Sequence, residues 1–127
     1  MCRPWISALM GALIVTGAAT AHAQDAARVQ PRSYRVVLEN AKVRVLEFNA
    51  RPGMGVCGLG KHSHPEHLTV MLSPAKVRVT EHGKTTVQVA KEGDVFWSPA
   101  ETHEVENYGG SNVRSLIIEI KTPAARR

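Results

Sequence analysis

The chain has 127 residues, of which 43% are hydrophobic and 21% charged, and its formal net charge is +5. This length is enough for one domain with a modest core and too short for two. The positive charges are scattered and are not interleaved with aromatic residues, which argues against nucleic-acid binding.

The first 23 residues have the pattern of an export signal. Arg3 supplies a positive charge, residues 6–19 are apolar, and Ala21-His22-Ala23 offers small residues at the two positions that a signal peptidase reads. A transmembrane helix needs about 20 apolar residues, so a retained membrane anchor is the less favoured alternative. We therefore expect cleavage before Gln24, an exported protein (periplasmic or secreted), and no stable membrane span after cleavage.

Removal of residues 1–23 leaves 104 residues with fifteen Lys and Arg and eleven Asp and Glu. Cys57 is then the only cysteine, so no intramolecular disulfide can form. This thiol can be buried, can cross-link a dimer or can lie near a metal. Burial is favoured because free cysteine is among the most buried residue types.

The rest of the chain is predicted to be β-structure after a flexible lead-in at residues 24–33, which are polar and have no period. Segments rich in β-branched residues are separated by Gly, Pro and Asn, and no window has a helical period. The predicted strands are 34–39, 43–49, 67–72, 76–80, 85–90, 95–98, 103–107 and 113–121. This spacing predicts a β-sandwich or small barrel over residues 34–121, with a tail at 122–127.

Two of these segments predict local features. Residues 76–80 and 85–90 alternate and flank a turn, which predicts a hairpin with one solvated face. His82 lies in that turn, so we exclude it from the candidate site. Residues 67–72 are apolar on both faces, which suggests a second sheet on one side and a partner subunit on the other. We therefore expect a homodimer.

Four histidines form the candidate site. His62 and His64 are two residues apart, so on an extended segment they point to the same face. His67 follows Pro65, which disfavours a helix but leaves the orientation of His67 open, and His103 lies downstream. Neutral imidazole binds divalent iron, zinc, copper and nickel. The pattern predicts a metal site, and the alternative is a solvated histidine-rich loop that binds nothing.

The order of these residues resembles the two conserved motifs of the cupin superfamily, roughly G(x)5HxH(x)3-4E(x)6G and G(x)5PxG(x)2H(x)3N. The histidine pair of the first falls on His62 and His64 and its terminal Gly on Pro74, and the second runs from Gly93 through Pro99 and His103 to Asn107. The resemblance covers about residues 36–121. It implies an all-β, single-domain jelly-roll barrel of the cupin type, in which His62, His64 and His103 hold a divalent metal.

Two positions depart from the family pattern. Counted back from the terminal Gly position, Pro74, the metal-binding Glu of the first motif falls on His67, so a fourth imidazole is expected in place of a carboxylate. The second motif has Glu101 where Gly is typical and is one residue shorter before His103. Neutral imidazoles leave the full double positive charge of the ion, which favours an anionic ligand or substrate. Fe(II) is the favoured metal, with Zn, Mn, Ni and Cu as alternatives.

Other carboxylates near the motifs are not expected to be catalytic bases. Glu104 and Glu106 alternate onto the face opposite His103, and Glu66 is a neighbour only in sequence. We interpret these residues as surface groups or as partners for the N–H of a metal ligand.

The histidine run is also close to the H-x-H-x-D-H zinc signature of the metallo-β-lactamase fold. That fold needs a longer chain and helices beside its sheets, so we set it aside. Three function classes remain. A dioxygenase-like enzyme acting on a small chelating substrate, such as a β-diketone, flavonol or thiol, is favoured. The alternatives are a metal-dependent lyase, isomerase or cyclase, and a non-enzymatic module that binds a metal or small ligand.

Overall fold

The structure is a computed structural model that describes residues 24–54 and 60–123. The expected export signal and Cys57 lie outside the described residues. The described part contains one short helix, α1 (Ala26–Val29), and nine strands. The strands are β1 Tyr34–Glu39, β2 Val43–Ala50, β3 His62–His64, β4 His67–Met71, β5 Ala75–Glu81, β6 Lys84–Ala90, β7 Val95–Ser98, β8 Glu101–Asn107 and β9 Val113–Ile120.

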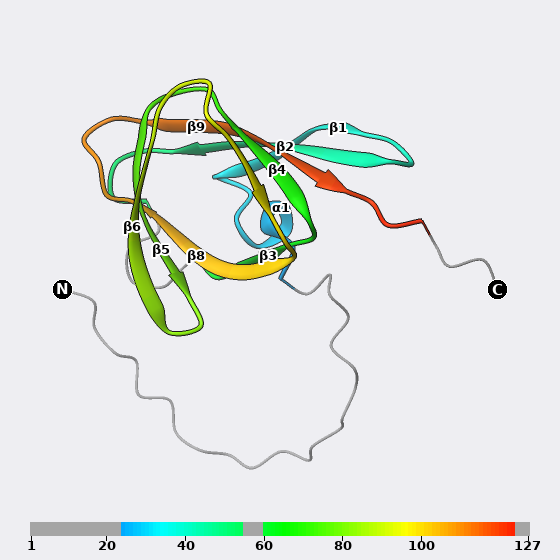
Figure 1. The fold of residues 1–127 in the computed structure, drawn as a ribbon, viewed down its shortest axis with the longest axis horizontal. Coiled ribbons are helices and arrows are strands. Elements are labelled where there is room, and N and C mark those ends of the chain that lie inside the picture. Colours follow the sequence, from blue (N-terminus) through cyan, green and yellow to red (C-terminus); the bar gives the residue numbers. More distant parts are fainter. Residues whose placement is uncertain (1–23, 55–59, 124–127) are drawn as a thin grey trace, which may run out of the picture.

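These strands form two antiparallel sheets (Figure 1). The five-stranded sheet has the order β1-β2-β9-β4-β7, and the four-stranded sheet has the order β3-β8-β5-β6. Strands far apart in the chain are therefore neighbours, as in a jelly roll. The all-β prediction is confirmed. Composition did not predict β3, because it has only three residues and all of them are polar.

The hydrophobic core is built largely from alternate residues of β2 and β9. Leu46, Phe48 and Ala50 of β2 are buried, as are Val113 and Ile117 of β9, because successive strand residues point to opposite faces. The same alternation turns Ser115 and Glu119 of β9 inward, and both are buried. A carboxylate is thereby carried into the interior, where it needs a partner.

Asn107, the last residue of the second motif, has a structural role at the end of β8. It is buried, and its amide donates to the carbonyl of Ala50 at 2.9 Å and to that of Ser111 at 2.8 Å. Its side-chain oxygen accepts from the Gly109 N–H at 3.1 Å. At the start of the motif, Gly93 has a φ of +86°, a left-handed conformation that favours glycine.

The segment 24–33 differs from the flexible lead-in that its composition predicted. It contains α1, in which Ala26 is fully buried, and the Asp25 side chain caps the helix by accepting from the Arg28 N–H at 3.1 Å. The Asp25 carboxylate also pairs with Arg44 of β2 at 2.6 Å. A four-residue helix is too short to produce a visible period, so only tertiary contacts reveal it.

The hairpin formed by β5 and β6 is confirmed, and Figure 1 shows it projecting from the body of the fold. His82 lies in its turn with a φ of 49°, and its side chain is 90% exposed. It is not one of the three residues of the histidine group described below. Within residues 24–54 and 60–123, no helix has the length and apolar character needed to cross a membrane.

Candidate metal centre

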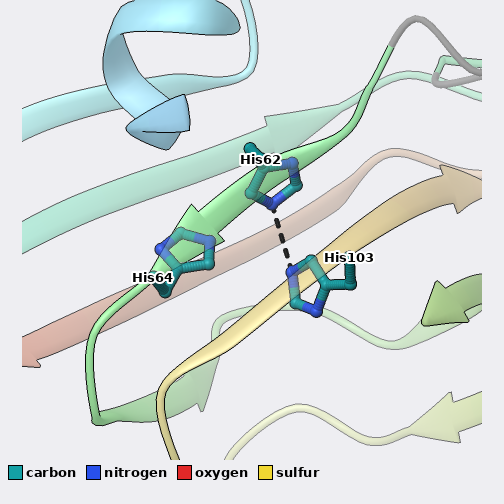
Figure 2. A group of neighbouring side chains, drawn as sticks. All are labelled: His62, His64 and His103. Atoms are coloured by element: carbon teal, nitrogen blue, oxygen red, sulfur yellow. Dashed lines mark hydrogen bonds between the residues drawn. The ribbon is translucent and has the colours of Figure 1, made fainter. Parts of the chain in front are cut away.

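Pairing of β3 with β8 brings three of the four predicted ligands together. His62 lies directly opposite His103 in the register, and His64 follows two residues later on the same face of β3. One ring nitrogen from each histidine lies within 4.8 Å of the other two, and Figure 2 shows the three rings turned toward one another. His62 and His64 are buried, and the His103 side chain is only 11% exposed.

Each of these rings has an acceptor at its Nδ1 atom. The Nδ1–H of His62 donates to the Gly60 carbonyl, and that of His64 donates to Glu119 Oε1 at 2.8 Å. His103 Nδ1 lies 3.2 Å from Glu101 Oε1. Because carbonyl and carboxylate oxygens only accept, these contacts assign the proton to Nδ1 in all three rings. For His62 the Gly60 carbonyl decides, since it is closer to Nδ1 than the Gln30 amide nitrogen at 3.3 Å. Each Nε2 atom then carries its lone pair, and that of His62 accepts from the Tyr34 hydroxyl at 2.9 Å.

The Nε2 atoms are the nitrogens that a metal ion would use. His64 Nε2 is buried with no hydrogen-bond partner among the described residues. The Nε2 atoms of His62 and His103 lie 3.1 Å apart (Figure 2), where two lone pairs repel unless a proton or a cation lies between them. Nitrogens bound to one ion at about 2.1 Å are about 3 to 4 Å apart. The 3.1 Å separation of the His62 and His103 nitrogens falls in this range, and the 4.8 Å limit of the whole group lies just outside it, so a small inward movement of one ring would let the three residues hold one metal ion.

Burial keeps two of these imidazoles neutral. Desolvation is the largest effect, and it lowers the pKa of His62 and of His64 to about 3. Neighbouring histidines lower both values further, since like charges disfavour protonation. Neutral imidazole is the form that binds metals, so these two groups are ready to do so at physiological pH.

Glu119 is a site residue that the sequence analysis did not identify. Its side chain is 4% exposed, and its second oxygen lies 3.0 Å from Nε of Arg44, which also pairs with Asp25. Burial raises the pKa of Glu119, and the Arg44 guanidinium opposes that rise. A signal was present in the sequence, because Glu119 is the single acidic residue of this strand and directly follows the apolar run Leu116-Ile117-Ile118.

Glu101, which was noted only as a departure from the family motif, lies between His103 and His67. Burial raises the pKa of this carboxyl, but the hydrogen bond from His103 and the neighbouring histidines outweigh burial, so the net shift is downward. Glu101 Oε1 lies 3.2 Å from His103 Nδ1 and 3.5 Å from His67 Nε2. An acidic group therefore stands beside the histidine cluster.

His67 is buried beside the cluster but is not part of the three-nitrogen group. Its ring centroid lies 5.0 Å from that of His64, and its Nδ1–H donates to the Pro65 carbonyl at 2.7 Å. The remaining nitrogen faces Glu101. Glu106, one of the carboxylates not expected to be a catalytic base, pairs with Arg78 at 3.5 Å.

Comparisons with known proteins identify the fold. A cupin domain from Bordetella pertussis is 22% identical, with a TM-score of 0.62 and coverage of 70% of this chain and 92% of that one. A protein with a double-stranded β-helix domain from Klebsiella pneumoniae is 21% identical, with a TM-score of 0.56 and coverage of 73% of this chain and 81% of that one. An RmlC-like cupin family protein from Methanocaldococcus jannaschii is 12% identical, with a TM-score of 0.57 and coverage of 71% and 80%.

No family profile matches the sequence, and no curated protein matches it. The similarity to solved structures is nevertheless consistent along most of the domain. This chain therefore has the fold of a small cupin domain, a double-stranded β-helix with a three-histidine cluster that could hold a metal ion.

Proposed function

We propose that this protein is an exported, metal-dependent enzyme that binds a divalent transition metal, preferably Fe(II), through His62, His64 and His103. Its substrate would be a small anionic or chelating molecule. The observation that supports the proposal is the arrangement of the three rings. Each Nδ1 has an acceptor, and the three rings bring one nitrogen each to within 4.8 Å of the other two.

This ligand set favours a reactive centre over a closed structural one. Three protein ligands leave coordination positions open, whereas structural zinc sites are closed by four. An ion held by neutral imidazoles keeps its full charge, so it would bind and polarise an anionic substrate and, as iron, would support oxygen chemistry. Glu119 and Glu101 would fix the orientations of His64 and His103 and make these ligands more basic.

Metal analysis tests the centre. Protein purified without oxygen should contain stoichiometric metal, and His62→Ala and His103→Ala should lose most of it, because each change removes one of three ligands. His82→Ala is the matched control, since that histidine is exposed on the β5–β6 hairpin. Full metal content in both site variants would contradict the proposal, as would a metal-free wild type that takes up no added Fe(II) or Zn(II).

Oxygen uptake tests the reaction class. The iron-loaded protein should consume dioxygen with one member of a panel of β-diketones, flavonols and thiols, and His103→Ala should not. Turnover without oxygen consumption would instead assign the site to the lyase, isomerase or cyclase class. Metal binding without turnover would favour a binding module.

The role of His67 as a fourth ligand stays a prediction. If His67 is a ligand, His67→Ala should lose metal. If His67 only contacts Glu101, the variant should keep its metal, and the same metal analysis measures the difference.

A further inference from the structure

Tyr34, the first residue of β1, borders the histidine cluster from the five-stranded sheet. It is 3% exposed, and its ring centroid lies 4.8 Å from that of His62 and 5.5 Å from that of His64. On its other side the ring packs on Phe48 at 4.8 Å. The hydroxyl lies 2.9 Å from Nε2 of His62.

The lone pair on His62 Nε2 has two competing uses. Because the His62 proton is on Nδ1, the Tyr34 hydroxyl is the donor in this hydrogen bond. A metal ion bound at Nε2 would take the same lone pair. Among the described residues, the hydroxyl has no other hydrogen-bond partner. A buried O–H without an acceptor is destabilising. When a metal ion occupies His62 Nε2, the Tyr34 hydroxyl therefore needs a new acceptor next to the ion.

We propose that the Tyr34 hydroxyl donates a hydrogen bond to an anionic ligand bound at an open position of the metal, and so positions anionic substrates. The inference rests on the proposed function and adds a selectivity for ligands that have an acceptor atom beside the coordinating one. Carboxylates and enolates have this chemistry, and azide is the simplest probe of it.

The Tyr34 hydroxyl is placed to donate, because its one hydrogen-bond partner among the described residues is the Nε2 lone pair of His62. An anionic acceptor next to the ion would replace that neutral partner with a charged one. Hydrogen bonds to charged groups are about twice as strong as those between neutral groups.

The experiment measures azide binding to the cobalt-substituted protein by visible spectroscopy at neutral pH. Tyr34→Phe should bind cobalt stoichiometrically, with the wild-type spectrum before azide is added, and should bind azide about tenfold more weakly, the loss of one charge-assisted hydrogen bond. Tyr108→Phe is the matched control, because Tyr108 is the only other tyrosine and is 42% exposed. It should match the wild type throughout.

Several results would overturn the inference. Equal azide affinity in Tyr34→Phe and the wild type would show that the hydroxyl is only a core group, while the metal centre itself would stand. Loss of cobalt from Tyr34→Phe would make Tyr34 a ligand or a structural support. If Tyr34→Phe does not fold, the Tyr108→Phe protein still decides, because it retains Tyr34 as its only tyrosine. Azide should then perturb the near-ultraviolet tyrosine band of the cobalt form, and an unchanged band would reject the idea.

Discussion

Single hydrogen bonds decide which nitrogen of each histidine is available. If the proton of each ring were on Nε2 instead of Nδ1, the three Nε2 atoms would have no lone pair for a metal ion. Gly60, Glu101 and Glu119 prevent this arrangement by holding the proton on the opposite side of each ring. The residues that make the site competent therefore include groups that would never touch the ion.

Replacing Glu119 with Gln tests the effect of its charge on His64. Gln keeps the shape and an acceptor for His64 but removes the charge that makes the imidazole a stronger ligand. We expect metal affinity to fall by about 10- to 100-fold, measured by competition with a chromogenic chelator. Glu47→Gln is the control, because Glu47 likewise has two basic partners, Arg35 and Arg114, but lies on the surface of the same sheet. Equal losses in both variants would point to a general effect of charge on folding.

At the scale of elements, the site depends on two contacts between segments that composition alone does not join. The β3–β8 register sets His62 against His103, and α1 packs against β1 and β3. Asp25, which caps the helix, begins a partly buried chain of polar contacts that continues through Arg44 and Glu119 to His64. The segment before the barrel is therefore part of the support of the site.

Replacing Asp25 tests that support. Asp25→Ala removes the helix cap and leaves Arg44 with one carboxylate partner, so the free energy of unfolding should fall by about 1 to 2 kcal/mol. Urea denaturation followed by circular dichroism measures it. Arg28→Ala, on the same helix, keeps the cap and should change stability little. No difference between Asp25→Ala and the wild type would mean that this segment behaves as the flexible lead-in first expected.

For the molecule as a whole, the outer strands of the five-stranded sheet leave apolar side chains in solvent. Val95, Phe96 and Trp97 of β7 are 59%, 44% and 55% exposed, and β1 exposes Val36 to Leu38 at 42% to 50%. Exposed apolar groups on edge strands are typical of surfaces that meet another chain. They are compatible with a homodimer, which stays a prediction.

The stability of the metal-free molecule should depend on pH. His62 and His64 have a pKa of about 3 when folded and 6.5 as the ordinary value, so below pH 6.5 the unfolded chain binds protons that the folded chain does not. Stability is therefore complete above pH 6.5 and is lost as the pH falls toward 3, by up to about 1.4 kcal/mol per pH unit for each group. Glu119, whose pKa is raised, opposes part of this loss.

Urea denaturation of the metal-free protein between pH 7 and pH 5 measures the slope. His82→Ala should leave it unchanged, because that residue is exposed in both states. A stability that is flat across this interval would show that the two histidines are not buried in the neutral form.

The β class, the positions of most strands, the exposed hairpin turn and three of the residues that meet at the site can be predicted from the sequence. All of these depend on local patterns: the alternation of side chains along a strand, the chemistry of turns, and the two-residue spacing of His62 and His64. The tertiary structure alone decided which residues surround them. Tyr34 lies 28 residues before His62, and Glu119 lies 55 residues after His64. Such partners are brought together by sheet order and register, which arise from packing between distant segments and are not encoded in any local window. For the same reason α1 was missed, since its stability comes from burial of Ala26 and from ion pairing with Arg44.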